Sequence, residues 1–246
     1  MMYIAVSKTQ HDSLLRWRVG RPDRIKFIAN HVDESNLRNR CKEKREMILN
    51  KNGILETSVV ICQMARLDRQ KNPFFLIKVT ELIQEQAPEI GFMLIGEGPL
   101  KIPLKREIKT RNLNGRVMLM GYRHDGLDLL NASDIVTLTS RWEGLPYVLL
   151  EANCFKKPVV ATDIPGNRDL VSDGESGYLA KTPEEFAEKL LKLARSKALR
   201  DEMGTKGYNR NKDLFSLSHL ALQMREIYDQ GVQGFKGSEV QRLPKV

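Results

Sequence analysis

The sequence predicts an α/β protein whose main domain is a doubly wound parallel sheet, followed by a helical C-terminal region. From residue 58, short apolar runs alternate with amphipathic stretches of helical length. The runs are apolar throughout, which is typical of strands that are buried on both faces of a parallel sheet. In such domains ligands bind beyond the carboxyl ends of the strands, so the segments after each strand are the candidates for function.

The first fifth of the chain has its own pattern. Residues 3–6 and 25–28 are predicted strands, and Ser7 is a candidate N-cap for a helix that reaches about Trp17. Residues 34–52 are polar, highly charged and weakly periodic, which is typical of a linker or a surface helix.

The main domain contains five apolar runs and a short sixth. These predicted strands are 59–62, 92–95, 117–119, 135–138, 159–161 and 177–179. After the first of them, Asn72 is a candidate N-cap and Pro73 suits the first helical position. The apolar stripe of that helix consists of Phe75, Val79, Leu82 and Ile83.

The C-terminal third is predicted to be helical. Thr182 and Pro183 begin one helix, and two more cover about 197–208 and 215–230. The periodicity is lost after that point, so residues 231–246 are expected to form a flexible tail.

Composition excludes several classes of protein. Apolar residues make up 41% and charged residues 29% of the 246 residues, which is ordinary for a soluble globular protein. No apolar run is long enough to span a membrane, and the first residues do not have the pattern of a secretory signal. The three cysteines are too few for a disulfide framework and lack metal-site spacing, so we expect a reducing, cytoplasmic compartment.

The positive charge is concentrated near the N-terminus. The formal net charge is +9, and residues 1–52 contain 12 Lys and Arg against 6 Asp and Glu. The excess indicates either a solvated basic face or a surface that meets an anionic partner. No nucleic-acid-binding motif is present, so nucleic acid is not expected, whereas contact with an anionic membrane face stays open.

Two basic residues follow the first main-domain strand. Arg66 and Lys71 stand just before a helix N-terminus, which carries unpaired N–H groups and partial positive charge. Two cations at that place suit a diphosphate, although a solvated loop is the alternative. After the second strand, Gly96 and Gly98 favour a tight turn over ligand contact.

The stretch after the fourth main-domain strand is the most informative. Pro146 suits the first helical turn, so Glu143 lies in the preceding loop and Glu151 about 7–8 Å along the helix axis from Pro146. Carboxylates so far apart can hold hydroxyl groups at two ends of an extended polyol, while N–H groups near Leu145 and Tyr147 face phosphate. The alternatives are an acid that complements the helix dipole for Glu143 and a paired structural carboxylate for Glu151.

Five segments resemble a known family in their order and spacing. They are ARLDRQKNP, LIGEGPL, SRWEGLPYVLLEA, PVVATDIPGNRDLV and SDGESGYL. Together they resemble the C-terminal, nucleotide-sugar-binding domain of the retaining GT-B glycosyltransferases of group 1 (family four). The resemblance covers about residues 56–210 and implies the Rossmann-like half of a GT-B fold. One departure is Ala65, which stands where the family usually has Gly.

The resemblance implies a donor site formed by Arg66, Lys71, Met120, Glu143, Gly144, Leu145, Tyr147, Val148 and Glu151. Arg66 and Lys71 match the pair that holds the diphosphate and stabilises the departing phosphate. Glu143 matches the residue that contacts the sugar hydroxyls, and these three are the implied catalytic residues. Glu151 matches the ligand of the ribose, and the backbone of Met120 matches the position that meets the base.

The implied function is transfer of a sugar, of hexosyltransferase type, from a nucleotide-diphosphate donor to an acceptor with retention, in polysaccharide or glycoconjugate synthesis. No cofactor and no metal are implied, because cations and a helix end stabilise the leaving group. The sequence accordingly contains no Asp-x-Asp. The implied acceptor is a sugar or a lipid-linked sugar, and the implied location is the cytoplasm, at the inner membrane face.

The resemblance also predicts how the chain is divided. Residues 1–52 match the end of an N-terminal acceptor domain plus a linker, residues 53–230 form the nucleotide-sugar domain, and 231–246 the tail. Most of the acceptor domain is missing, and none of the four histidines matches the family's catalytic-site histidine. This chain is therefore expected to be the donor-binding half. The alternatives are a non-catalytic nucleotide-sugar-binding module, a subunit of a split enzyme whose partner supplies the missing domain, or another GT-B-like enzyme such as an epimerase or a phosphorylase.

Overall fold

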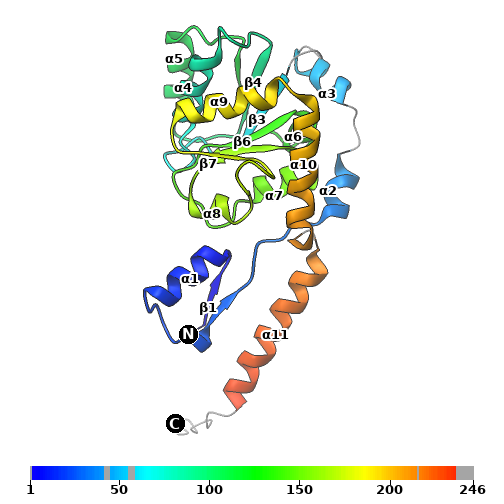
Figure 1. The fold of residues 1–246 in the computed structure, drawn as a ribbon. Helices are drawn as coiled ribbons and strands as arrows, with labels where there is room; N and C mark the ends of the chain where they lie inside the picture. Colours follow the sequence, from blue (N-terminus) through cyan, green and yellow to red (C-terminus); the bar gives the residue numbers. More distant parts are fainter. Residues whose placement is uncertain (1, 42–44, 55–58, 215, 237–246) are drawn as a thin grey trace, which may run out of the picture.

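A computed structural model of the chain describes residues 2–41, 45–54, 59–214 and 216–236. Figure 1 shows a main domain at the top, a small N-terminal unit (residues 2–27) below it, and a long helix that leads away from the main domain. A segment that we call the connection, residues 28–33, joins the N-terminal unit to the main domain.

The main domain is built on a six-stranded sheet in which every pair of neighbouring strands is parallel. Its strands are β3 (Val59–Met64), β4 (Ile90–Ile95), β5 (Val117–Gly121), β6 (Ile135–Leu138), β7 (Val159–Thr162) and β8 (Tyr178–Ala180). The order across the sheet is β5-β4-β3-β6-β7-β8, so the winding reverses between β3 and β6. The predicted doubly wound parallel sheet is confirmed.

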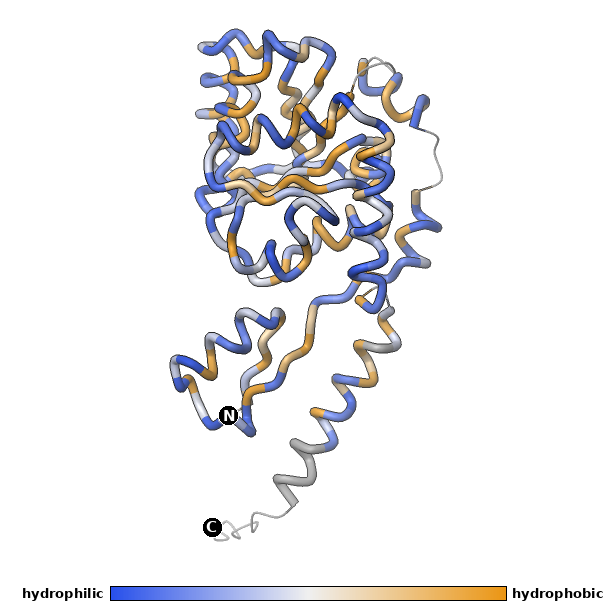
Figure 2. Tube along the Cα trace, viewed as in Figure 1, coloured by the Kyte–Doolittle hydropathy of each residue, from blue (hydrophilic) through white to orange (hydrophobic). Residues whose placement is uncertain are grey.

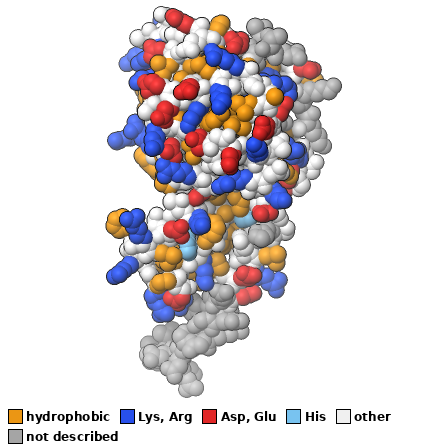
Figure 3. Space-filling model, in the orientation of Figure 1, with side chains coloured by type: hydrophobic (Ala, Val, Ile, Leu, Met, Phe, Trp, Pro, Cys, Tyr) orange, Lys and Arg blue, Asp and Glu red, His pale blue; other side chains and the backbone are white. Residues whose placement is uncertain are grey.

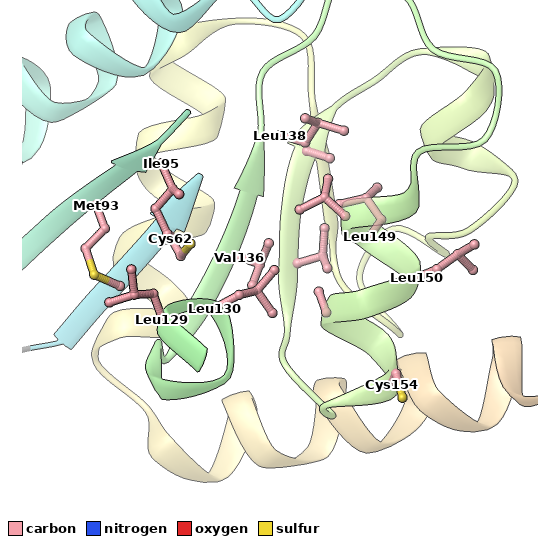
Figure 4. Packing of buried hydrophobic residues seen from close by; sticks show 14 of the residues in the cluster. Cys62, Met93, Ile95, Leu129, Leu130, Val136, Leu138, Leu149, Leu150 and Cys154 are labelled. Carbon is pink, nitrogen blue, oxygen red and sulfur yellow. The ribbon is translucent and has the colours of Figure 1, made fainter. Parts of the chain in front are cut away.

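Successive side chains of each strand enter two different cores. In β3, Cys62 belongs to the core drawn in Figure 4, with Met93 and Leu149, whereas Ile61 belongs to the core on the opposite face. Figure 2 accordingly shows the strands at the centre of the main domain as largely hydrophobic. Burial on both faces explains why the apolar runs do not alternate with polar residues.

Helices cover both faces of this sheet. They are α4 (Pro73–Ile83), α5 (Lys101–Thr110), α6 (Gly126–Ala132), α7 (Tyr147–Cys154), α8 (Pro165–Arg168), α9 (Pro183–Ala194) and α10 (Lys197–Asn211). Buried residues of α4, α5 and α9 pack in the core that contains Ile61, and those of α6 and α7 pack in the core that contains Cys62. At the start of α9, the side chain of Thr182 accepts a hydrogen bond from the N–H of Glu185, as an N-cap does.

The start of α4 differs from the prediction in two details. Asn72 occupies the N-cap position, but its φ of 48° is left-handed and its side chain makes no capping hydrogen bond. Asparagine tolerates this conformation better than most residues, which explains its place there. Of the predicted stripe, Val79 and Ile83 are buried, whereas Leu82 is exposed, and Leu76 fills its place on the inner face.

The N-terminal unit consists of β1 (Tyr3–Ala5), α1 (Lys8–Arg16), the 3-10 helix η1 (Pro22–Arg24) and β2 (Ile25–Phe27). The two strands pair in parallel. The side chain of Ser7 accepts a hydrogen bond from the N–H of Gln10, and the helix ends at Trp17. The predicted strands, cap and helix of this segment are therefore confirmed.

Two short helices follow the connection. They are α2 (Glu34–Arg40) and α3 (Arg45–Lys51), and they bury Leu37, Ile48 and Leu49 in the same core as Cys62. Of the two alternatives for this segment, surface helices docked on the main domain are what the structure has. The boundary between domains at residue 52 stays a prediction.

The last helix extends beyond its predicted end. After η2 (Lys212–Leu214), helix α11 runs over Leu217–Lys236, so the segment expected to begin the flexible tail at residue 231 is helical as far as 236. Apolar residues at positions 228, 232 and 235 keep helical spacing in the sequence, but the glycines between them favoured the prediction of a tail. Residues 237–246 lie outside the described residues.

The described helices include none that could cross a membrane. Even the longest of them does not combine the required length with the required hydropathy.

Candidate functional site

A cavity of about 480 Å³ lies at the carboxyl edge of the sheet, next to the point where the strand order reverses. We call it the strand-end cavity. Its lining residues are Val6, Asn30, Met64, Lys71, Glu143, Gly144, Leu145, Pro146, Tyr147, Val148 and Glu151. The loop after β3 supplies Lys71, and the loop and helix after β6 supply the segment from Glu143 onward. All of the predicted site residues except Arg66 and Met120 therefore line it, because parallel strands on either side of the reversal leave a crevice there.

Size alone does not select this cavity. A larger hollow of about 630 Å³ lies between α4 and α9, and the exposed Leu82 lines it. Its polar lining consists of the surface side chains Gln86, Glu184, Glu188, Lys192 and Arg195. The strand-end cavity is the better candidate because it combines half-buried charges with the N-terminus of a helix.

Lys71 and Glu143 form an ion pair in the strand-end cavity. The Nζ of Lys71 lies 2.5 Å from Oε1 of Glu143, and the Oγ of Ser140 donates to the same oxygen at 2.5 Å. The side chains of Lys71 and Glu143 are only 18% and 7% exposed. Each charge therefore compensates the other where water is scarce, and a ligand that takes Lys71 must replace Glu143 as its partner.

Arg66 lies apart from this pair. Its side chain is 70% exposed, and its Nη2 lies 3.1 Å from Asp68 and donates to Gln70 Oε1 at 3.3 Å. It does not line the strand-end cavity, although it belongs to the same loop as Lys71. In this structure Arg66 is thus a solvated loop residue, whereas Lys71 lines the cavity, and the roles of both residues stay predictions.

The N-terminus of α7 faces the strand-end cavity. The helix begins at Tyr147, one residue later than predicted, and Pro146 is its N-cap residue. The first N–H groups of a helix have no acceptor within it, so those of Tyr147 and Val148 are available where these residues line the cavity. They give this part of the cavity partial positive charge.

Glu151 is the second carboxylate of the strand-end cavity, one turn into α7. In the part of the chain that the structure describes, no donor reaches its carboxyl group, and Ser140 and Lys71 serve Glu143 instead. Burial raises the pKa of Glu151 to about 7. A carboxyl group kept half-buried without a partner is costly for a structural role, which favours a ligand-binding role.

Met120 does not line the strand-end cavity. It lies near the carboxyl end of β5, the edge strand, two strands away from β3, and it packs partly buried against the core. The structure thus places Met120 at the same edge of the sheet but separate from Glu143 and Lys71.

The glycine turn after β4 supports the site without lining the cavity. Gly96 has a φ of 140°, and a Cβ there would lie 2.0 Å from the carbonyl oxygen of Ala65. The carbonyl oxygen of Glu97 accepts a hydrogen bond from the N–H of Leu67 at 2.9 Å. The tight-turn interpretation of the Gly96–Gly98 segment is confirmed, and the turn braces the start of the loop that carries Lys71.

Sequence reasoning missed three residues of this region. A Cβ on Gly166 would lie 2.4 Å from the carbonyl oxygen of Gly144, so the loop after β7 supports the Glu143–Gly144 segment by direct backbone contact. Val6 and Asn30 line the cavity from the first part of the chain. Local patterns cannot reveal these contacts, because they join segments that are far apart in the sequence.

Metal ligands do not gather here. Within the described ranges, no three His, Cys, Asp or Glu side chains are close enough together to hold a metal ion.

Comparison with known proteins shows which family this chain is similar to. Residues 44–210 match the family described as "Glycosyl transferases group 1". One curated relative is the Escherichia coli protein "UDP-Gal:alpha-D-GlcNAc-diphosphoundecaprenol alpha-1,3-galactosyltransferase", which is 32% identical over 185 residues, covering 72% of this chain and 47% of that protein. Another is the "Poly(ribitol-phosphate) alpha-N-acetylglucosaminyltransferase" of Staphylococcus aureus (strain COL), 32% identical over 154 residues, covering 61% of this chain and 31% of that protein. The chain thus spans about half the length, or less, of these curated relatives.

Solved structures share the fold. A mutant of S. aureus TarM in complex with Fondaparinux, alpha-GlcNAc-glycerol and UDP is 26% identical, with a TM-score of 0.80 over 92% of this chain and 43% of that one. Anabaena Alr3699/HepE in complex with UDP and glucose is 22% identical, with a TM-score of 0.82 over 93% of this chain and 62% of that one.

The raised pKa of Glu151 predicts an unusual effect of pH on stability. Its folded-state pKa of about 7 exceeds the ordinary value of 4.5, so the folded chain binds the proton more tightly than the unfolded chain. The free energy of unfolding therefore falls as pH rises from about 4.5 to about 7, by at most about 3 kcal/mol. We expect Glu151→Gln to raise the melting temperature at pH 8 and to leave it nearly unchanged at pH 4.5.

Thermal unfolding at both pH values tests this expectation, with Glu188→Gln on the exposed face of α9 as the control. A Glu151→Gln variant that is no more stable than the parent at pH 8 would show that the carboxylate is well solvated.

Proposed function

This chain belongs to the group 1 glycosyl transferase family, and on that premise we propose that it carries the donor-binding half of an enzyme that transfers a sugar from a nucleoside diphosphate to an acceptor with retention of configuration. The observation that carries the proposal is the joint lining of one cavity by Lys71, Glu143, Glu151 and the N-terminus of α7. Together they offer a cation, two carboxylates and free N–H groups, which suit the diphosphate and the hydroxyl groups of a nucleotide sugar. The family match supports a transferase over a module that only binds.

The diphosphate is proposed to bind between Lys71 and the N-terminus of α7. Lys71 is already held in the cavity, and the N–H groups of Tyr147 and Val148 line it. Arg66 is proposed to join them by leaving Asp68, an exchange that its 70% exposure makes inexpensive. These groups stabilise the charge on the leaving diphosphate, so no divalent metal is needed in this proposal.

The two carboxylates are proposed to hold different hydroxyl groups. Glu143 is released from Lys71 when phosphate arrives, and it can then accept from the transferred sugar. None of the described residues donates a hydrogen bond to Glu151, so this carboxylate gives up no partner when it binds a ligand. Its position one turn inside α7 suits the ribose. Met120 is proposed to meet the base through its backbone. The relatives named above support uridine as the base, because the E. coli protein's name contains UDP-Gal and the TarM crystal contains UDP.

The acceptor is proposed to be a sugar or a lipid-linked sugar, bound on the side that faces the N-terminal unit. The name of the E. coli relative, which acts on a GlcNAc-diphosphoundecaprenol, supports the lipid-linked class. The whole protein is proposed to act in polysaccharide or glycoconjugate synthesis, and the N-terminal unit to belong to the domain that completes the acceptor side.

We also propose that the protein works in the cytoplasm at the inner membrane face and touches anionic lipid through the turn after α1. Trp17 in this turn is 76% exposed, and Arg16, Arg18 and Arg21 surround it, all exposed. Figure 3 shows Lys and Arg side chains at the edges of the N-terminal unit. An exposed indole among arginines suits the interface of an anionic bilayer.

The phosphate assignment predicts a specific loss of affinity. We expect Arg66→Ala to weaken UDP binding about 10- to 100-fold, because a charge-assisted hydrogen bond is lost, with an unchanged melting temperature. Lys71→Ala should weaken it similarly and also lower the melting temperature, because Glu143 then keeps a half-buried charge without its cation. Isothermal calorimetry with UDP, and with GDP and ADP for comparison, measures the affinity.

The matched control is Arg69→Ala, which removes an exposed arginine from the same loop. If Arg66→Ala and Arg69→Ala bind UDP equally well, Arg66 is not a phosphate ligand. If the parent protein binds no nucleoside diphosphate at all, the proposed function is wrong for this chain.

The carboxylate assignment predicts that the two variants affect UDP and its sugar-linked forms differently. Because Glu143 competes with phosphate for Lys71, Glu143→Gln should bind UDP at least as tightly as the parent but bind UDP-N-acetylglucosamine or UDP-galactose relatively more weakly. Glu151→Gln should weaken all three, because the ribose is common to them. Equal losses in both variants for every ligand would reject this division of roles.

Membrane contact is tested by sedimentation with vesicles. We expect binding to vesicles that contain phosphatidylglycerol but not to pure phosphatidylcholine, and we expect a variant with Arg16, Arg18 and Arg21 changed to Ala to lose it. A control with Lys105 and Arg106 on the exposed side of α5 changed to Ala should still bind. Equal binding by both variants would remove the turn from the proposed contact.

A further inference from the structure

The loop that carries Glu143 is tied to the first part of the chain by one side chain. Asn30, in the connection, donates a hydrogen bond from Nδ2 to the carbonyl oxygen of Leu145 at 2.7 Å. Asn30 is half-buried and lines the strand-end cavity beside the residues it holds. The bond therefore reaches from outside the matched family region, residues 44–210, to the centre of the candidate site.

The hydrogen bond from Asn30 acts at a point where it can fix the conformation of the loop. Leu145 precedes Pro146, so the peptide unit between them has no N–H and can be fixed by hydrogen bonding only through its carbonyl group. The Leu145 side chain is 5% exposed and anchored in the core, which leaves rotation of this peptide as the remaining freedom. The same peptide leads directly into α7, whose first N–H groups line the cavity.

The main domain supplies further hydrogen bonds and backbone contacts to the loop. Gln70 donates to the carbonyl oxygen of Trp142 at 3.0 Å, and Gly166 contacts the backbone of Glu143 and Gly144. These contacts hold the first half of the loop, ahead of Leu145. Only the Asn30 bond, among the hydrogen bonds of the described residues, acts on the second half from the connection.

The N-terminal unit is itself docked next to this loop. The N–H and Oγ1 of Thr9 donate to the carboxylate of Asp169, which follows α8, at 3.3 and 2.9 Å. The side chain of Val6 lies against Gly144, with its Cγ2 3.0 Å from where a Cβ would be. A shift of the unit relative to the main domain would thus act on the same loop that Asn30 holds.

We propose that Asn30 is a positioning residue of the donor site, which holds the Leu145 peptide so that the start of α7 and the Glu143 loop keep the shape that binds the nucleotide. The affinity of the main domain for its donor then depends on the docking of the N-terminal segment. This inference rests on the proposed function for its ligand but not for its structural part.

The two tryptophans of the chain make a direct experiment possible. Trp17 is remote from the site in the turn after α1, so Trp17→Phe leaves Trp142, which is 55% exposed in the loop next to Glu143, as the sole indole. In that background we compare Asn30→Asp, which has the same shape but cannot donate when ionised, with Asn30→Gln, which keeps the amide donor. Asn36→Asp on the exposed face of α2 is the control.

Without ligand, we expect Asn30→Asp to change the emission and the acrylamide quenching of Trp142, and the control to leave both unchanged. With UDP, we expect Asn30→Asp to bind at least about 10-fold more weakly, because it loses the hydrogen bond and also places a negative charge near the diphosphate, and Asn30→Gln, which adds no charge, to recover most of the loss. A residue with only a structural role would lower the melting temperature without changing the Trp142 signal.

The inference is overturned if Asn30→Asp keeps the Trp142 signal of its parent, or if the control changes the signal as much. A parent that binds no UDP, GDP or ADP instead contradicts the proposed function, and the ligand-free Trp142 measurement still decides whether Asn30 positions the loop.

Discussion

Six parallel strands that end at one edge are the constraint on which the site depends. Because β3 and β6 pair side by side, with Ile61 opposite Ile135, the loops that follow them must leave the sheet together. One carries Lys71 and the other Glu143, and the ion pair between them is a consequence of this register. The crossover helices leave in opposite directions at this point, so the crevice stays open above the two loops.

The charges of the site are balanced unequally. Glu143 has two donors, whereas Glu151 has none within the described chain and resists ionisation through burial. Glu143 is therefore compensated by Lys71, whereas Glu151 lowers the free energy of unfolding as the pH rises from about 4.5 to about 7. Among the described residues, the site thus contains one carboxyl group without a donor, Glu151, and one held in an ion pair, Glu143. A polyhydroxy ligand would give Glu151 a hydrogen-bond partner and would break the pair between Glu143 and Lys71.

The sequence predicted the elements better than the contacts between them. The strands were predictable because burial on both faces leaves apolar runs, and Ser7 and Thr182 were predictable because capping is local. That Lys71, Glu143 and Glu151 line one cavity was predictable because the fold class indicates which loops meet at the edge of the sheet. The end of α11 was missed because glycine signals were given more weight than helical spacing. What the sequence could not predict is the pairing of distant groups, such as the bond from Asn30 to a residue 115 positions away, because such contacts leave no local pattern.

The backbone contact at Gly166 limits which residues can stand at that position. Main chain rests on main chain there, so any larger residue at that position would collide with the carbonyl groups of the Glu143–Gly144 segment. Substitution at Gly166 therefore cannot adjust the conformation of the Glu143–Gly144 loop without a collision. Side chains that line the cavity without such a backbone contact, such as Met64 and the outward-facing Tyr147, can vary more freely. The ion pair of Lys71 and Glu143 can therefore stay in place while side chains at the border of the cavity change.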